Sequence, residues 1–441
     1  MPQKFTAPQG SELIDTIFVN ARIIDPETGF DKLGYLVVKD GKIADFGAGD
    51  IHTDIEKIDC GGNVLCPGLL DIQVHFRTPG QEHKEDIITG TKSAAAGGVT
   101  TAVCMANTSP TIDNEIVVRD LYDVVEKNAY VNVFTYAAIT KGLQGKELTD
   151  MAALKKAGVV GFSDDGLPVM NSLTMRRAME NARDLDILIS QHAEDSNLSD
   201  GGCINEGQIS KKLGLKGVPN ASEAIIVERD ILLSELVDGV RYHVLHISTH
   251  QAIEAVRRAK SKGYSITCEA APHHFILTDE AVLHSDTLAK MNPPLRANKD
   301  KLAIIEGLRD GTIDVIATDH APHDVALKSV HISKAAFGIV GLETMLPLSL
   351  VLYHTKQMSL LDILAKMTYK AADVIKKPLG RIKKDAVADL VLIDLDVEWE
   401  IQSSEFSSKS KNSPFDGYKV KGRAIRTVVA GKTVFELSNY K

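Results

Sequence analysis

The stretch Asp71-Ile72-Gln73-Val74-His75-Phe76-Arg77 directly follows an apolar run, Val64–Leu70, and so predicts the carboxyl end of a buried strand. Alternate side chains of a strand point to the same side, so Gln73 and His75 are expected to share a face. A strand ending in Asp-x-His-x-His would offer two imidazole ligands to a metal ion. Here glutamine stands at the first position, which makes Gln73 a doubtful ligand beside His75.

Beyond this strand, short apolar runs alternate with amphipathic helical patterns through the middle of the chain. Eight such strand–helix units predict an α/β protein with a parallel (β/α)8 barrel, the TIM-barrel fold. The expected strands are Leu69–Val74, Thr101–Met105, Val131–Ala137, Val159–Phe162, Ile187–Ser190, Tyr242–Leu245, Ser265–Cys268 and Asp314–Ala317. The expected helices include Glu85–Ala96, Val117–Lys127, Ser222–Leu236, Gln251–Lys262 and Lys301–Leu308.

Both ends of the chain have a different texture, with alternating strands and turn signals such as Asp40-Gly41. Because chain termini often lie close together, we expect residues 1–62 and 385–441 to form one small β-sandwich domain. Residues 63–384 then form the barrel. Within the C-terminal part, the polar segment Ser403–Ser413 is expected to be a surface loop.

Composition excludes several classes of protein. The 441 residues carry a net charge of −9, which argues against nucleic acid as a partner. No apolar run approaches the ~20 residues of a spanning helix, so no membrane association is expected. The five cysteines are scattered and form no Cys-x-x-Cys pair, which indicates reduced thiols and a cytoplasmic location.

Polar side chains gather at the expected strand ends, where a barrel of this type has its active site. Imidazoles and carboxylates at one mouth mark a metal site, and without a thiolate they suit zinc, with manganese, cobalt or iron as alternatives. Such a metal activates water and polarises a carbonyl, and a free aspartate can move the proton. The expected reaction is hydrolysis at an amide-like carbon, or its reversal. The residues at these ends include His75, Arg77, Asn107, Asp164, Asp165, His192, His246, Asp319 and His323.

Several motifs together resemble the amidohydrolase superfamily and, within it, the dihydroorotases. The resemblance spans nearly the whole chain and implies the barrel with a small β-domain described above. It further implies a zinc-dependent enzyme that interconverts N-carbamoyl-L-aspartate and L-dihydroorotate in de novo pyrimidine biosynthesis. The motifs are 67–77, 79–85, 96–101, 104–108, 162–166, 292–296 and 317–323, which run from Pro-Gly-Leu-Leu-Asp to Ala-Thr-Asp-His-Ala-Pro-His.

The resemblance also implies roles for individual residues. Asp165 matches a carboxylate that bridges two metals, and Asp319 matches the general acid/base. One or two zinc ions per chain are implied, as are a homodimer and a possible association with aspartate carbamoyltransferase. The implied metal ligands are His75, Asp165, His192, His246 and Asp319, with Gln73 doubtful. The implied substrate-binding residues are Arg77, Asn107, Asn292, His323, Phe337 and Gly338.

Two other functions remain open at this point. One is a hydantoinase, dihydropyrimidinase or allantoinase, although these relatives usually carry a carboxylated lysine at the end of the fourth strand, where this chain has Ser163-Asp164-Asp165. The other is a non-catalytic scaffold for aspartate carbamoyltransferase, which the loss of a ligand at Gln73 favours. Some site residues also have simpler interpretations, because Arg77 could form a surface ion pair and Asn107 could serve a turn. His273, His274 and His320 are expected to be structural.

Overall fold

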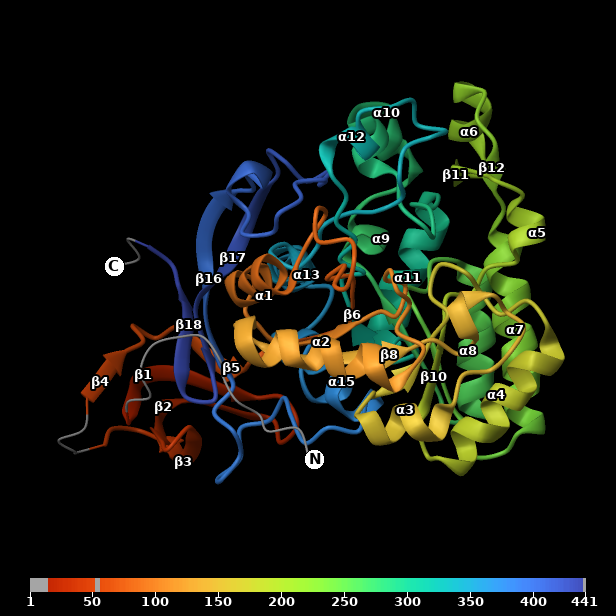
Figure 1. The fold of residues 1–441 in the computed structure, drawn as a ribbon. Helices are drawn as coiled ribbons and strands as arrows, with labels where there is room; N and C mark the ends of the chain where they lie inside the picture. Colours follow the sequence, from red (N-terminus) through yellow and green to blue (C-terminus); the bar gives the residue numbers. More distant parts are fainter. Residues whose placement is uncertain (1–14, 52–55, 439–441) are drawn as a thin grey trace.

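The computed structural model describes residues 15–51 and 56–438, and Figure 1 shows their arrangement. Eight parallel strands follow one another in chain order around the barrel, and all eight predicted strands are confirmed with small differences at their ends. The predicted segment 1–14 of the small domain lies outside the described residues. The barrel strands are β6 (Leu69–Val74), β7 (Val99–Cys104), β8 (Asn132–Ala137), β9 (Gly161–Phe162), β10 (Leu188–Gln191), β13 (Arg241–Val244), β14 (Ile266–Ala270) and β15 (Val315–Ile316).

The barrel closes where the chain after β15 meets β6. The His75 amide donates to the His320 carbonyl at 2.9 Å, and Val74 pairs with His320 in parallel. Asp71 binds the same seam, because its carboxylate accepts hydrogen bonds from the Thr318 amide and hydroxyl. Burial raises the pKa of Asp71 to about 7, against the effect of these hydrogen bonds. The first residue of the opening motif therefore joins the first and last strands.

Helices cover the outside of the barrel, and the five predicted helices are confirmed. Several begin at a residue whose side chain accepts from the first turn, as Asp86, Asn114 and Thr249 do. No helix in the described ranges is long and apolar enough to cross a membrane. The helices are α1 (Ile87–Ala96), α2 (Glu115–Asn128), α3 (Met151–Ala157), α4 (Ser172–Asp184), α5 (Ser196–Ser199), α6 (Gln208–Leu213), α7 (Asn220–Leu236), α8 (His250–Ser261), α9 (Pro272–Ile276), α10 (Val282–Ser285), α11 (Asn298–Asp310), α12 (Val325–Lys328), α13 (Met345–His354), α14 (Leu360–Lys366) and α15 (Tyr369–Val374).

The two ends of the chain pair in a second sheet, which lies beside the barrel in Figure 1. Its order is β18-β17-β16-β5-β1-β2-β3, with β4 paired to β1, and side chains from both of its halves share one core. Short helices and strands complete the fold. The strands of this sheet are β1 (Thr16–Asp25), β2 (Phe30–Lys39), β3 (Lys42–Ala48), β4 (Glu56–Asp59), β5 (Val64–Pro67), β16 (Leu390–Glu400), β17 (Lys419–Val429) and β18 (Lys432–Glu436). The remaining elements are β11 (Ile204–Asn205), β12 (Gly217–Val218), η1 (Lys141–Leu143), η2 (Asp279–Ala281), η3 (Asp286–Ala289) and η4 (Ser403–Glu405).

The apolar run Val64–Leu70 is two strands rather than one. Gly68 separates β5, in the second sheet, from β6, in the barrel. A Cβ atom at Gly68 would come within 2.2 Å of the Thr100 side chain, so only glycine fits this passage. The limits of the two domains stay a proposal. Because β5 pairs with strands of the second sheet, the first boundary is better placed after Pro67 than after residue 62.

The segment Ser403–Ser413 is only in part the surface loop that its polar composition predicts, because Ser404, Glu405, Ser407 and Lys409 are exposed but its second half is largely buried. Ser408, Ser410 and Asn412 are buried, because their side chains form hydrogen bonds with Glu85, Lys84 and Ala321 of the barrel domain. The sequence pattern could not reveal these partners, since they lie far away along the chain. The five cysteines are free and buried, in agreement with their predicted reduced state.

Candidate active site

The predicted metal ligands converge at the carboxyl ends of the barrel strands. His75 follows β6, Asp165 follows β9, His192 follows β10, His246 follows β13 and Asp319 follows β15. All five side chains are buried. The backbone of His246 and Asp319 has positive φ angles of 31° and 49°, a conformation that costs free energy in residues other than glycine. Such strain is typical of functional sites.

Asp165 lies at the centre of this cluster. Its Oδ1 atom is 3.7 Å from His192 Nδ1 and 3.6 Å from His246 Nε2, while its Oδ2 atom is 3.4 Å from His75 Nε2. Burial opposes its ionisation, yet the hydrogen bond with His246 and the charges of the neighbouring imidazoles hold the pKa of Asp165 below its usual range. The carboxylate thus faces one imidazole with one oxygen and two with the other.

One side of the cluster has the donor set of a zinc site. One ligand atom each from Asp165, His192 and His246 lies within 4.8 Å of the other two, and His192 Nδ1 is 2.9 Å from His246 Nε2. Two imidazoles and one carboxylate are a common zinc donor set, and three protein ligands leave a position open for water or substrate. These residues therefore fit the implied metal.

The other side of the cluster is less complete. His75 Nε2 lies 3.1 Å from Asp319 Oδ1. The Gln73 amide nitrogen approaches Asp165 Oδ1 at 3.5 Å, so Gln73 and His75 do share a face, as expected. The Gln73 Oε1 atom is buried without a hydrogen-bond partner. An amide oxygen is a weaker zinc donor than imidazole, so this side is the poorer metal position.

Two further side chains orient the imidazoles. Asn107 Oδ1 lies 3.0 Å from His75 Nδ1, and Glu194 Oε2 lies 2.9 Å from His192 Nε2. In each contact, the ring nitrogen that points away from Asp165 forms the hydrogen bond, so the other ring nitrogen faces Asp165. Asn292 donates to Glu194 at 2.8 Å. Against the effect of burial, the His192 hydrogen bond lowers the pKa of Glu194 to about 2.

Glu194 is a supporting residue that the sequence pattern did not identify, although its position two residues after His192 at a strand end is a signal for such a role. Asn107 has a structural role that the sequence did not reveal: it contacts both His75 and Asp165. The predicted substrate contacts of Asn107 and Asn292 stay predictions.

Arg77 and His323 form a second group beside the metal cluster. Arg77 is buried rather than in a surface ion pair, and its Nη2 atom donates to His323 Nε2 at 3.3 Å. Burial lowers the pKa of Arg77 to about 10, so the guanidinium stays charged at neutral pH. Burial and the Arg77 charge lower the pKa of His323 to about 2, which keeps its imidazole neutral. This neutral ring and fixed cation can bind a carboxylate.

The loop with Phe337 and Gly338 borders the same group. A Cβ atom at Gly338 would meet the His323 ring at 2.7 Å, so glycine permits the close approach. The Gly338 amide donates to the Lys290 carbonyl, and Lys290 Nζ lies 4.3 Å from the centre of the Phe337 ring. The structure thus brings both predicted loop residues to the barrel mouth. His273, His274 and His320 are buried, in keeping with a structural role.

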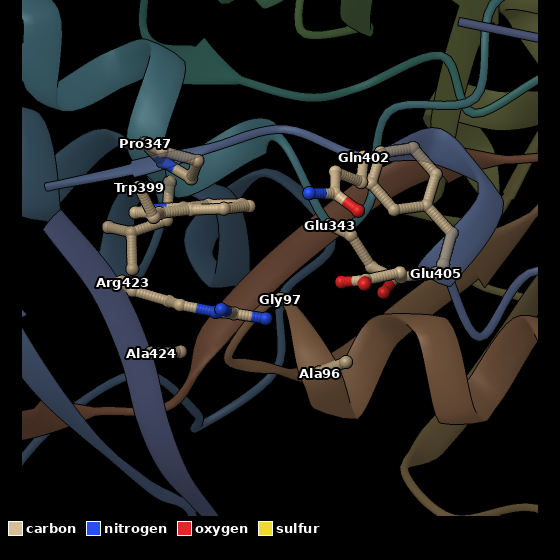
Figure 2. A pocket seen from close by; sticks show the side chains of 11 residues that line it. Ala96, Gly97, Glu343, Pro347, Trp399, Gln402, Glu405, Arg423 and Ala424 are labelled. Atoms are coloured by element: carbon tan, nitrogen blue, oxygen red, sulfur yellow. The ribbon is translucent and has the colours of Figure 1, made fainter. Parts of the chain in front are cut away.

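A separate small pocket lies where the second sheet meets α1 and α13 (Figure 2). Glu343 and Arg423 are among its lining residues, and the Arg423 guanidinium lies 4.4 Å from the centre of the Trp399 ring. None of the predicted site residues lines it. We therefore place the candidate active site at the barrel mouth, where the convergent ligands are.

Comparison with known proteins places this geometry in a family. The model of the Dihydro-orotase-like family matches residues 62–252. A dihydroorotase of Ehrlichia chaffeensis is 56% identical over 424 residues, which cover 95% of this chain and 94% of that protein. The chain belongs to the dihydroorotase family. A Geobacter sp. dihydroorotase is 47% identical, over 96% of this chain and all of its own length.

Solved structures of other cyclic amidohydrolases share the fold of this dihydroorotase family member. The L-hydantoinase (dihydropyrimidinase) of Arthrobacter aurescens has a TM-score of 0.86 and 26% identity, with 96% of each chain covered. The dihydropyrimidinase of Brevibacillus agri has a TM-score of 0.84 at 21% identity, which shows the fold alone. The predicted α/β barrel with a small β-domain from both chain ends is confirmed, and strand pairing makes that domain one eight-stranded sheet. The chain is a cyclic amidohydrolase by family.

Proposed function

We propose that this protein is a dihydroorotase that interconverts N-carbamoyl-L-aspartate and L-dihydroorotate in de novo pyrimidine biosynthesis, with zinc as its metal. The observation that carries the proposal is the position of Asp165, whose two oxygens face His75 on one side and His192 and His246 on the other. Arg77 and His323 stand beside this cluster as a site for an anionic substrate. A substrate with a carboxylate and a cyclic amide matches both parts.

Each residue has a chemical task in this proposal. Zinc held by Asp165, His192 and His246 would supply a Lewis acid that polarises the amide carbonyl and lowers the pKa of water. In ring opening, Asp319 accepts the proton of the attacking water and delivers it to the ring nitrogen as the carbon–nitrogen bond breaks. In ring closure, Asp319 takes the proton from the attacking nitrogen and delivers it to the carboxyl oxygen that leaves as water, as the carbon–nitrogen bond forms. Arg77 binds the substrate carboxylate and so orients the ring.

Direct assay tests this proposal. Interconversion of dihydroorotate and carbamoyl aspartate is followed by absorbance with zinc present, with hydantoin and dihydrouracil as control substrates. We expect turnover of dihydroorotate and little of the controls. Preferential turnover of hydantoin would favour a hydantoinase. Absence of all turnover would favour the scaffold for aspartate carbamoyltransferase, the alternative that Gln73 supports.

Replacing Arg77 with alanine is expected to weaken substrate binding more than the chemical step. A charged hydrogen bond contributes about 1.5–3 kcal/mol, so the loss of this guanidinium should raise KM for dihydroorotate by roughly 10- to 100-fold. The turnover number should fall much less. Steady-state kinetics measure both values. Arg176→Ala, on the outer face of α4, removes the same charge and should keep wild-type kinetics. An unchanged KM in Arg77→Ala would contradict the assignment.

The chain is expected to hold about one zinc ion tightly, because only one side of the Asp165 cluster has a full ligand set. Elemental analysis after dialysis measures the metal content. Gln73→His should raise it to about two ions per chain, since it restores an imidazole beside His75. Gln73→Ala is the matched control and should leave it at about one. Two zinc ions that resist dialysis in the wild-type protein would refute the assignment of a weak position.

We also propose a homodimer, a cytoplasmic location and a possible association with aspartate carbamoyltransferase. The family resemblance supports these assignments. Light scattering of the purified protein, alone and after mixing with that transcarbamoylase, measures both kinds of assembly.

A further inference from the structure

The chain segment Ser408–Asn412, here called the strap, reaches from the second sheet to the barrel mouth. The strap lies in the connection that leaves the second sheet after β16 and returns to it at β17, drawn in blue in Figure 1. Ser408, Ser410 and Asn412 are buried. Buried polar groups need hydrogen-bond partners, so the partners of the strap show which parts of the barrel it fixes.

At one end of the strap, Asn412 joins two loops of the candidate site. Its Oδ1 atom accepts from the His323 amide at 3.0 Å, and its Nδ2 atom donates to the carbonyls of Ala321 and Gly338, each at 3.0 Å. Its own carbonyl accepts from the Val340 amide at 3.0 Å. One buried side chain thus sets the distance between the backbone of His323 and that of Gly338.

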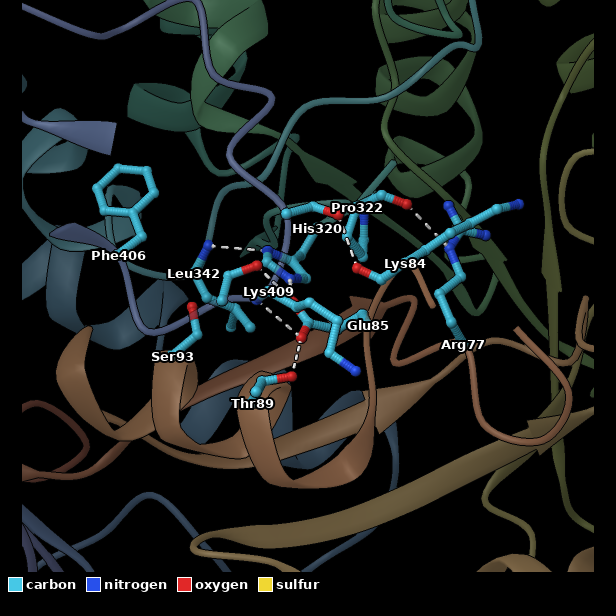
Figure 3. A network of polar contacts seen from close by, with 12 residues as sticks. Arg77, Lys84, Glu85, Thr89, Ser93, His320, Pro322, Leu342, Phe406 and Lys409 are labelled. Atoms are coloured by element: carbon cyan, nitrogen blue, oxygen red, sulfur yellow. Dashed lines mark hydrogen bonds and ion pairs between the residues drawn. The ribbon is translucent and has the colours of Figure 1, made fainter. Parts of the chain in front are cut away.

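At its other end, the strap holds Glu85, which is fully buried (Figure 3). The Ser408 hydroxyl and the Lys409 amide, the latter at 3.1 Å, donate to the Glu85 carboxylate. Glu85 Oε2 in turn lies 3.4 Å from His320 Nε2, while His320 Nδ1 accepts from the Gly341 amide at 3.1 Å. His320 directly follows Asp319. The strap therefore contacts the loop after β15 directly at Ala321 and His323, and through Glu85 at His320.

We propose that the strap positions the substrate-binding groups of the barrel mouth, with Asn412 as the positioning residue for His323 and Gly338. The proposal rests on the proposed dihydroorotase function. It gives the small domain an indirect part in substrate binding, because the connection between β16 and β17 fixes the loop that would meet the substrate. Asn412 does not itself need to touch the substrate, so the effect of its loss should fall on binding.

Asn412→Ala tests the proposal. The loss of its hydrogen bonds frees the two loops, and we expect KM for dihydroorotate to rise at least about tenfold. The turnover number should stay within about threefold, and zinc content should not change. Asn412→Asp is a second, isosteric variant that keeps the acceptor for the His323 amide but sets carboxylate oxygen against two carbonyls. It should raise KM in the same direction.

Ser407→Ala is the matched control next to the strap. Ser407 is exposed and donates to Glu343 through its backbone amide, which alanine keeps. This variant should have wild-type KM. Hydrogen exchange gives a readout apart from activity, because peptides covering 321–323 and 338–340 should exchange at least about tenfold faster in Asn412→Ala while the β6 peptide does not.

The possible failures can be told apart. Wild-type KM and wild-type exchange in both Asn412 variants would overturn the strap proposal while leaving the dihydroorotase function intact. Equal losses in turnover and zinc content would overturn it too, since they would reflect general disruption. Absence of dihydroorotate turnover in the wild-type protein would overturn the proposed function and, with it, the positioning of substrate groups.

Discussion

Asp319→Asn is expected to lower the turnover number for dihydroorotate by roughly 10²–10⁴, the usual contribution of a general acid/base. Asparagine has the same shape as aspartate, but it cannot accept a proton from water and return it to the ring nitrogen. Asp319 Oδ1 lies 3.1 Å from His75 Nε2, so the carboxylate stands beside the metal cluster rather than in a surface position. Steady-state absorbance assays in both reaction directions measure the fall in turnover number.

Asp324→Asn is a suitable control for this experiment. It makes the same change five residues later, where the Asp324 side chain accepts from the Leu327 amide at the start of α12. Asparagine is an equally good residue at that position, so activity should be kept. Near wild-type turnover in Asp319→Asn, with normal zinc content and thermal stability, would show that another group moves the proton.

The barrel could be predicted from the sequence because its strands are short, apolar and evenly separated by amphipathic helices. The register of polar residues at the strand ends followed from the same pattern. The division of Val64–Leu70 into β5 and β6 could not be predicted, since both pieces are apolar and buried. The decisive feature is Gly68, which passes close to Thr100, a residue more than thirty positions later.

The candidate site shows the same limit. The residues with metal chemistry were predicted because imidazoles and carboxylates at strand ends are recognisable one strand at a time. The supporting contacts were not, because they join distant parts of the chain. Glu194 supports His192, and Asn412 supports His323 across about ninety residues of sequence. The composition of Ser403–Ser413, rich in serine and lysine, predicts exposure to solvent, because the sequence does not show its buried partners such as Glu85.

Asp165→Asn is expected to remove the tightly held zinc and to lower turnover by more than about 10³. Among the residues that the structure describes, Asp165 is the one carboxylate whose oxygens lie within 3.7 Å of all three imidazoles of the cluster. Asparagine keeps the shape but offers only a neutral oxygen, and the imidazoles lose the negative charge that balances a dication. Elemental analysis should find less than about 0.1 zinc per chain.

Asp164→Asn separates this effect from a general loss of structure. Asp164 is the adjacent buried carboxyl, but it accepts from the amides of Ile139 and Thr140 at 2.7 and 3.0 Å and supports a loop. Burial raises the pKa of Asp164 to about 6, whereas that of Asp165 is lowered, so the two neighbours have opposite environments. Asp164→Asn should lower thermal stability yet retain zinc. If Asp165→Asn kept a full zinc ion per chain, the metal would have to be bound elsewhere, because no other carboxylate faces these three imidazoles together within the described residues.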